Sequence, residues 1–299
     1  MRWQVGSARV TRIVEQDFAI PPATLLANFD ERRLAEHARW LEPCFMRNDR
    51  QLLMSFQTFL VESCGKRIIV DTCRGNDRPL PKGRGTIQTR YLQDLEQVVA
   101  RYDVDYVMCT HLHYDHVGWN TMWSQGCWVP TFSRARYLFS REDFEYWATG
   151  ADDGNVDLQF SVEPIVQAGL HQLVESSHRI TDEVVLEPTP GHTPGHVSVR
   201  IVSQGEQALI TGDFVHHPVQ LLEPAWSSKA DVDPLLAART RSRMAEGLLA
   251  EGVLIIGTHF SAPTCGHLVR DGASRRFQPC AAEHRIAGGA RVPAAGDAA

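Results

Sequence analysis

The sequence predicts a layered α/β fold, and two patterns support this prediction. Short apolar runs bounded by turn residues recur along the chain and are typical of strands, while several longer segments repeat apolar residues at helical spacing. The composition is that of a globular protein, because 43% of the 299 residues are hydrophobic and 22% are charged. A chain of this length buries roughly three quarters of its unfolded surface and needs no disulfide bonds to hold its core.

The elements expected in the first half follow from these patterns in chain order. Apolar residues alternate with polar ones near the start, and Leu92, Leu95, Val98 and Val99 recur at helical spacing. The expected elements are a first strand from Trp3 to Ile13, a helix at Glu31–Trp40, a hairpin of strands at Leu52–Glu62 and Lys66–Thr72, a helix at Ile87–Arg101 and a strand at Asp105–Thr110.

The second half repeats this alternation of strands and helices. Its longest helix has leucines, alanines and a methionine on or near one face. The expected elements are strands at Arg136–Phe139, Val184–Leu186, Val197–Val202, Ala208–Thr211 and Gly252–Gly257, with helices at Arg141–Trp147 and Pro234–Glu251.

No linker divides the chain, so residues 1–285 are expected to form a single domain. Within it, residues 17–50 are too long and irregular for a simple connection, and we interpret them as a lid or a homodimer contact. Residues 286–299 are rich in Ala and Gly and are expected to be a flexible tail.

Charge and cysteine content exclude several classes of function. The net charge is 30 − 36 = −6, which argues against nucleic acid as a partner. No apolar run reaches the 18 or so residues of a membrane helix, and the start lacks the apolar region of a signal peptide, so no membrane partner is expected. The seven cysteines are scattered, which is typical of reduced thiols and predicts a cytoplasmic protein.

The most informative feature is the sequence His111-Leu112-His113-Tyr114-Asp115-His116, which directly follows a short apolar run. Polar residues crowded at the end of a buried strand need partners, and a metal ion provides one. Alternate residues of an extended chain point the same way, so His111 and His113 can bind one ion. Imidazole nitrogens with a carboxylate oxygen suit zinc, and also iron, cobalt or manganese.

Three more candidate metal ligands follow apolar runs later in the chain. His192 lies in Pro190-Gly191-His192-Thr193, Asp213 in Thr211-Gly212-Asp213, and His259 in Gly257-Thr258-His259. Each pattern alone also fits a turn with ordinary hydrogen bonds. Their coincidence in one chain favours a metal site.

Together these motifs resemble those of the metallo-β-lactamase superfamily. The resemblance runs from Asp71 in Val-Asp-Thr to His259 and implies a four-layer αββα sandwich with a dinuclear site at one edge. It implies that His111, His113 and His192 hold one metal ion, that Asp115, His116 and His259 hold the second, and that Asp213 bridges them, with two Zn²⁺ as the expected ions. His196 is expected to support the site without binding metal, and Asp71 to support the ligand loop.

The sequence after Gly212-Asp213 resembles the branch of lactonases and organophosphate hydrolases. Lactone hydrolases of this family often have a Tyr three residues after the bridging Asp, whereas this chain has His216. We assign catalytic roles to His216, as the group that contacts or protonates substrate, and to Asp115. His216 and the adjacent His217 also fit a purely structural role.

The expected reaction is hydrolysis of a small-molecule lactone or other carboxylic ester, with N-acyl homoserine lactones among the candidates. A hydroxide held between two metal ions would serve as nucleophile, which agrees with the lack of a Gly-x-Ser-x-Gly element. Phosphotriester or β-lactam hydrolysis by the same site remains open, as does a mononuclear iron dioxygenase acting on a persulfide. The aromatic residues that follow the motif either line an apolar pocket over the metals or fill the core: Trp119, Trp123, Trp128, Phe132, Tyr146 and Trp147.

Overall fold

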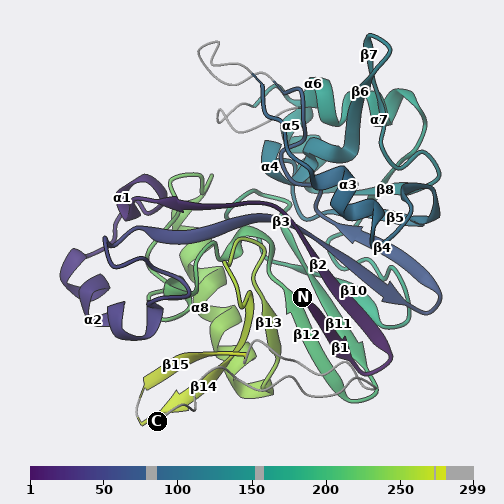
Figure 1. Cartoon of the computed structure of the whole chain (residues 1–299). Coiled ribbons are helices and arrows are strands. Elements are labelled where there is room, and N and C mark those ends of the chain that lie inside the picture. The colour runs from purple at the N-terminus through teal and green to yellow at the C-terminus, as the bar shows by residue number, and fades with distance from the viewer. Residues whose placement is uncertain (79–85, 152–157, 273, 281–299) are drawn as a thin grey trace, which may run out of the picture.

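The computed structural model describes residues 1–78, 86–151, 158–272 and 274–280, and it confirms the predicted α/β fold (Figure 1). Two mixed sheets form its centre. The first contains, in spatial order, β1 (Arg2–Val5), β2 (Ala8–Ile20), β3 (Leu52–Ser63), β4 (Lys66–Val70), β5 (Tyr106–Cys109), β8 (Arg136–Ser140) and β9 (His171–Val174). The second contains β10 (Val184–Pro188), β11 (Val197–Ser203), β12 (Glu206–Ile210), β13 (Leu254–Ile256), β14 (Cys265–Asp271) and β15 (Ser274–Pro279).

The remaining elements surround these sheets. A separate hairpin is formed by β6 (Thr121–Ser124) and β7 (Cys127–Pro130). The helices are α1 (Pro22–Leu25), α2 (Glu31–Leu41), α3 (Tyr91–Glu96), α4 (Tyr114–Val117), α5 (Arg141–Ala148), α6 (Leu158–Ser161), α7 (Glu163–Gln167) and α8 (Pro234–Glu251). Figure 1 shows α3 to α7 grouped together, away from α8.

Alternation within the buried strands produces four layers. In β4, Ile68 and Val70 pack in the core between the two sheets, whereas Ile69 packs with residues of α3 and α5. In β12, Ala208 and Ile210 lie in that same inter-sheet core, and Leu209 packs on the side of α8. The strands are apolar on both faces because each sheet is covered by the other sheet and by helices. This arrangement confirms the αββα sandwich.

The structure corrects three of the predicted elements. The first strand is two strands, since the chain turns at Gly6, which has φ +56°. The helix expected at Ile87–Arg101 is shorter: Asn76 exchanges two hydrogen bonds with the backbone of Thr89, and helical structure begins only at Tyr91. The strand expected at Gly252–Gly257 is β13, and it is not the last strand of the chain, because β14 and β15 follow it.

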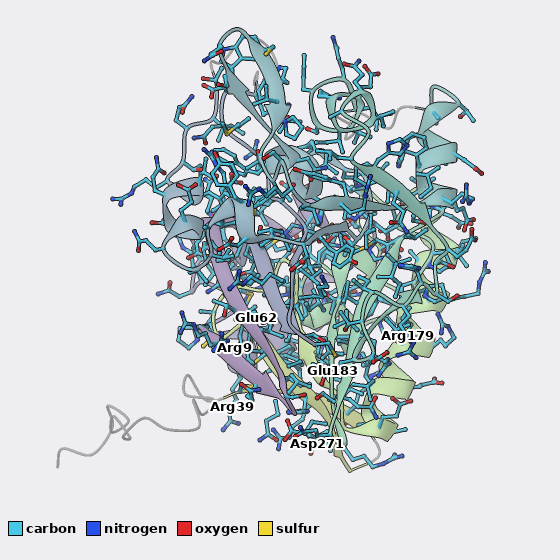
Figure 2. The ribbon with its side chains drawn as sticks, turned by 90° about the vertical axis from the view of Figure 1, so that its right-hand side faces the viewer. Arg9, Arg39, Glu62, Arg179, Glu183 and Asp271 are labelled. Carbon is cyan, nitrogen blue, oxygen red and sulfur yellow. The ribbon has the colours of Figure 1, made fainter. Side chains whose placement is uncertain are left out.

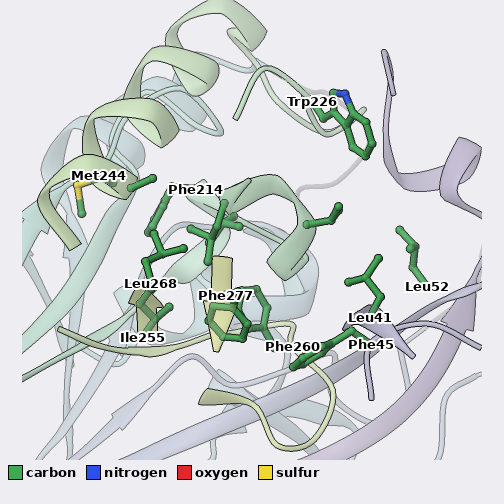
Figure 3. Packing of buried hydrophobic residues seen from close by; sticks show 14 of the residues in the cluster. Leu41, Phe45, Leu52, Phe214, Trp226, Met244, Ile255, Phe260, Leu268 and Phe277 are labelled. Atoms are coloured by element: carbon green, nitrogen blue, oxygen red, sulfur yellow. The ribbon is translucent and has the colours of Figure 1, made fainter. Parts of the chain in front are cut away.

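Residues 17–50 contain the end of β2, both N-terminal helices and several residues of the core. Leu41 and Phe45 from this segment are fully buried and pack near Phe260 and Phe277, as Figure 3 shows. Phe45 contacts the rings of both phenylalanines at centroid distances of 6.3 and 5.9 Å. The segment is therefore anchored to the core around α8. The tail at 286–299 lies outside the described residues.

Membrane crossing by a helix finds no support in the structure. Among the described residues, no helix combines the length and the apolar character that a membrane span requires.

Glu183, labelled in Figure 2, joins the two sheets through hydrogen bonds with three serines. Its carboxylate accepts hydrogen bonds from Ser203 at 2.6 Å, from Ser7 in the β1–β2 turn, and from Ser63 at 2.7 Å. These hydrogen bonds, with that of Ser203 the largest cause, lower the pKa of Glu183 to about 2. A carboxylate whose pKa is lowered by folding stabilises the protein above its unfolded pKa, and this contribution is lost as the pH falls toward the folded value.

Replacing Glu183 with Gln is therefore expected to lower the free energy of unfolding by about 1 kcal/mol at pH 7, since hydrogen bonds to charged groups contribute about 1.5–3 kcal/mol and exposure to solvent reduces this. The loss should shrink as the pH is lowered from 4.5 toward 2, because the unfolded wild-type chain takes up a proton at Glu183 in this range while the folded chain keeps the carboxylate charged. Urea denaturation of both proteins across this range measures the difference. Glu145→Gln, at a side chain that is 65% exposed, is the control. An equal difference at every pH would contradict the prediction.

Candidate metal centre

The structure brings together all seven residues that the sequence nominated as metal ligands. Their ligand atoms form three overlapping groups, a fourth group joins His192 and Asp213 to His216, and within each group these atoms lie within 4.8 Å of one another. The residues follow the ends of β5, β10, β12 and β13: His111, His113, Asp115, His116, His192, Asp213 and His259. Segments separated by up to about half of the chain thus meet at one place.

Two of the groups correspond to the two expected metal positions. One contains His111, His113 and His192, and the other contains Asp115, His116 and His259. In the first group, Nε2 of His192 lies 3.0 Å from Nδ1 of His113. In the second, the Nε2 atoms of His259 and His116 are 3.2 Å apart. Each group therefore directs ring nitrogens toward a common point.

Asp213 lies between the two groups. Its Oδ2 is 3.3 Å from Nε2 of His116 and 3.6 Å from Nε2 of His192, while its Oδ1 is 3.2 Å from Nε2 of His259. The carboxylate thus contacts histidines of both groups, as a bridging ligand must. Its position depends on Gly212, which has φ +57° and whose Cβ, if present, would lie 2.5 Å from Nε2 of His196.

The outer ring nitrogens of three of these histidines are held by hydrogen bonds. They bind a carboxylate or a backbone carbonyl: His116 to Asp71 at 3.0 Å, His192 to Asp231 at 2.9 Å, and His259 to the carbonyl of Ser55 at 3.0 Å. Such bonds fix the ring orientation and leave the inner nitrogen free to bind a metal, which is the usual arrangement around metal-binding histidines. Nε2 of His111 is buried and has no hydrogen-bond partner among the described residues. A divalent ion fits this set of nitrogens and oxygens.

Burial and mutual contact shift the pKa values of these groups in different directions. Burial lowers the pKa of His111 and of His192 well below its usual value, so both rings are neutral, which is the form that binds metals. At His116 and His259 burial is again the largest single cause and lowers the pKa, but the facing carboxylates, Asp213 foremost, together outweigh it and the pKa is raised. Burial raises the pKa of Asp213, but the facing histidines lower it well below its usual value.

The family of the chain follows from comparison of its sequence with known families. The sequence profile of the Metallo-beta-lactamase superfamily matches residues 57–259, which is more than half of the chain. The chain belongs to the metallo-beta-lactamase superfamily. This match spans the strands and loops that carry all seven ligand candidates, and it confirms the predicted family and fold.

Two curated proteins show sequence similarity to part of this chain. An N-acyl homoserine lactonase of Bacillus thuringiensis is 26% identical over 158 residues, which are 52% of this chain and 56% of that protein. An N-acyl homoserine lactonase of a Bacillus species is 30% identical over 105 residues, or 34% of each chain. The chain thus matches between a third and somewhat more than half of the length of these relatives.

Solved structures resemble the whole fold. The hydrolase AbOPH of the beta-lactamase superfamily has a TM-score of 0.78 at 22% identity, covering 95% of this chain and 98% of that one. AidC, a dizinc quorum-quenching lactonase solved with the product N-hexanoyl-L-homoserine, has a TM-score of 0.75 at 19% identity, covering 94% and 97%. At these identities the similarity establishes the metallo-beta-lactamase fold alone.

The three other histidines near the metallo-beta-lactamase motifs have different surroundings. Nε2 of His196 accepts a hydrogen bond from the backbone N–H of Asp213 at 2.7 Å, so His196 supports the turn. Nε2 of His216 lies 3.1 Å from Oδ2 of Asp213, and its Nδ1 has no hydrogen-bond partner among the described residues. His217 is fully buried and donates to the carbonyl of Phe45 at 2.8 Å. Of the two adjacent histidines, His216 therefore belongs to the site and His217 to the core.

The sequence left open whether the aromatic residues after the motif line the pocket or fill the core. The structure shows that other residues form the pocket wall. Its large apolar side chains come from β2, α1 and β3: Phe18, Ile20, Leu25, Met54 and Phe56. The aromatic residues after the motif do not line it. Trp119 stacks on Tyr91, Trp147 is buried with its indole donating to Asp143, and Trp123 is 49% exposed on the separate hairpin. Only their nearness in sequence had suggested a place in the site.

Several residues of the site were not predicted from the sequence. Asp231 lies in a polar turn where an aspartate commonly caps a helix, and Asp233, two residues later, does cap α8. Ser55 contributes through its backbone carbonyl, which every residue has. Tyr114 lines the pocket and belongs to the motif, so its position between His113 and Asp115 was the one available signal.

Proposed function

We propose that this chain is a metal-dependent hydrolase that cleaves a lactone or other carboxylic ester, with N-acyl homoserine lactones as first candidates. The observation that carries the proposal is the pocket, which joins an apolar wall to a floor of histidine and aspartate. Similarity to N-acyl homoserine lactonases in sequence adds support. The pocket has a volume of about 150 Å³, below the roughly 300–1,000 Å³ typical of sites for drug-sized ligands, which favours a compact reacting group.

We assign the two metal positions to the two ligand groups described above, with two Zn²⁺ as the resident ions and Asp213 shared between them. The mixture of imidazole nitrogens and carboxylate oxygens suits zinc and also iron, manganese or cobalt. Bound divalent ions would supply a water with a pKa lowered toward 7 and would polarise the carbonyl of the substrate. The chain itself orients the ligands through Asp71, Asp231 and the carbonyl of Ser55.

Two side chains face the reacting group in this proposal, His216 and the ligand candidate Asp115. His216 lines the pocket, and its ring can donate a hydrogen bond to the substrate oxygen from beside Asp213. Asp115 is the more accessible of the two carboxylates, with 15% of its side chain exposed against 4% for Asp213. It can accept a proton in the pocket and return it to the departing alkoxide.

Replacing His216 with Ala is expected to lower kcat about tenfold or more, since loss of one hydrogen bond that is made in the transition state costs about 1.4 kcal/mol or more. The metal content should stay at the wild-type level, because neither of the two assigned ligand sets needs this ring. Steady-state kinetics and metal analysis on the same preparation test both parts. Unchanged kcat would remove His216 from the mechanism.

Residues 17–50 are proposed as a cover of the pocket, in preference to a homodimer contact. Phe18, Ile20 and Leu25 contribute three of the large apolar side chains of its wall. These side chains would pack against an acyl chain, and substrates with longer acyl chains should then have lower KM values.

A panel of substrates tests the proposed function. The zinc-loaded protein is assayed with acyl homoserine lactones, aryl esters, paraoxon and nitrocefin, and we expect turnover of the lactones or aryl esters. Turnover of paraoxon alone or nitrocefin alone would replace the proposal with a phosphotriesterase or a β-lactamase. Metal analysis of protein purified without added metal addresses the iron dioxygenase: about one iron per chain, with oxygen uptake on a persulfide, would favour that enzyme over two zinc ions.

A further inference from the structure

Arg241 of α8 is a fully buried cation that connects two segments near the site, the turn after β12 and the loop that precedes α8. Its Nη1 donates to the carbonyl of Phe214 at 2.9 Å, directly after Asp213, and its Nε donates to the carbonyl of Pro224 at 2.9 Å. Nη2 lies 3.4 Å from the hydroxyl of Ser227 and 3.6 Å from Oδ2 of Asp231. A buried guanidinium is costly to desolvate, so this set of contacts indicates a specific role.

Asp231 is the buried acid that faces this arginine. Neither its side chain nor that of Arg241 is accessible to solvent. Its Oδ2 accepts the backbone N–H of Ser228 at 3.0 Å, and its Oδ1 faces Nδ1 of His192 at 2.9 Å. One carboxylate therefore holds a metal-ligand candidate with one oxygen and the backbone of a loop with the other.

That loop is part of the pocket wall. Ser228 and Ala230 line the pocket beside His192. The loop also pairs with the N-terminal segment: the N–H of Lys229 donates to the carbonyl of Leu25 at 2.9 Å, and Leu25 itself lines the pocket. The pocket wall at Ser228 and Ala230 and the ligand candidate His192 are thus both held by Asp231.

We propose that Asp231, held by Arg241, positions His192 and the pocket wall at Ser228 and Ala230 as one unit. Both residues are positioning residues, because they act through His192 and the loop and do not line the pocket. The inference rests on the proposed metal site. It predicts that loss of this ion pair weakens metal binding and raises KM together, although neither residue is among the proposed ligands.

Three variants test the proposal: Asp231→Asn, Arg241→Met and, as a matched control, Arg243→Met. Arg243 lies on the same helix, is exposed, and donates to the carbonyl of Pro188 at 3.2 Å, away from the site. Zinc affinity is measured by competition with a chromophoric chelator, under conditions where circular dichroism shows each variant to be folded. We expect 10–100-fold weaker zinc binding for Asp231→Asn, the range seen when groups that orient a metal ligand are changed. Arg241→Met should shift affinity in the same direction, and Arg243→Met should leave it unchanged.

A second measurement uses the wild-type protein and does not depend on whether a variant folds. Long-range ¹H–¹⁵N NMR of histidine-labelled protein reports which ring nitrogen carries the proton, and the proposal requires Nδ1–H at His192. A folded Asp231→Asn variant with wild-type zinc affinity, or a proton on Nε2 of His192 in the wild type, would overturn it. If the wild type binds no zinc, the proposed function fails, and the NMR result still decides whether Asp231 orients His192.

Discussion

Replacing Asp213 with Asn is expected to reduce ester hydrolysis more than a hundredfold and to weaken binding of the metal ions. Changing a residue that merely orients a ligand already costs about 10–100-fold, and Asp213 contacts histidines of both groups directly. The neutral amide would remove the negative charge that faces His116, His192 and His259 within 3.2–3.6 Å. Its NH₂ group would also direct a donor toward ligand nitrogens. Metal analysis after dialysis and kcat/KM on the best substrate of the panel measure the two losses.

The matched control is Asp233→Asn. Asp233 caps α8 by accepting the N–H of Leu236 at 2.9 Å, and asparagine caps a helix about as well as aspartate. This control makes the same chemical change close to the site and should keep wild-type metal content and activity. Retention of two metal ions by Asp213→Asn, with activity within tenfold of wild type, would contradict the assignment of Asp213 as the shared ligand.

The parts of the site that depend on a few consecutive residues could be predicted from the sequence. Ligands such as Asp213 and His259 directly follow apolar strands, and a strand end is a local feature that periodicity reveals. The turn at Gly212 has to be glycine, because of its positive φ and its closeness to His196. Both are properties of short segments, so both can be predicted without knowledge of the tertiary structure.

Partners supplied from elsewhere in the chain could not be predicted in this way. Asp231 supports His192 only because α8 and its preceding loop fold back beside the site, and nothing in its neighbours marks it. The pocket wall shows the same limit, since Phe18 lies far upstream of the histidine motif in sequence and reaches the site through the long strand β2. Trp119 and Trp147, close to the motif in sequence, face the helical layer instead.

Zinc is expected to raise the Tm of the metal-free protein by about 5–10 °C. An ion that binds only the folded state at a thousand times its Kd stabilises it by about 4.1 kcal/mol, and 1 kcal/mol corresponds to roughly 2 °C for a chain of this size. The ligand atoms are already grouped within 4.8 Å, so binding requires little rearrangement of the fold. Thermal denaturation after treatment with a chelator, with and without added Zn²⁺, measures the shift. Mg²⁺ should give a much smaller shift, because it prefers oxygen ligands in octahedral geometry.

The matching variant combines His111→Ala with His259→Ala and so removes one nitrogen from each ligand group. Both side chains are buried, so the metal-free variant is expected to melt below the wild type, and the quantity compared is the rise in Tm on adding zinc. That rise should largely disappear, because each group keeps only two of its own three ligands beside the shared Asp213. A rise equal to that of the wild type would mean that zinc stabilises the chain from another place. In that case neither group would be the metal site, and the hydrolase mechanism built on them would be wrong.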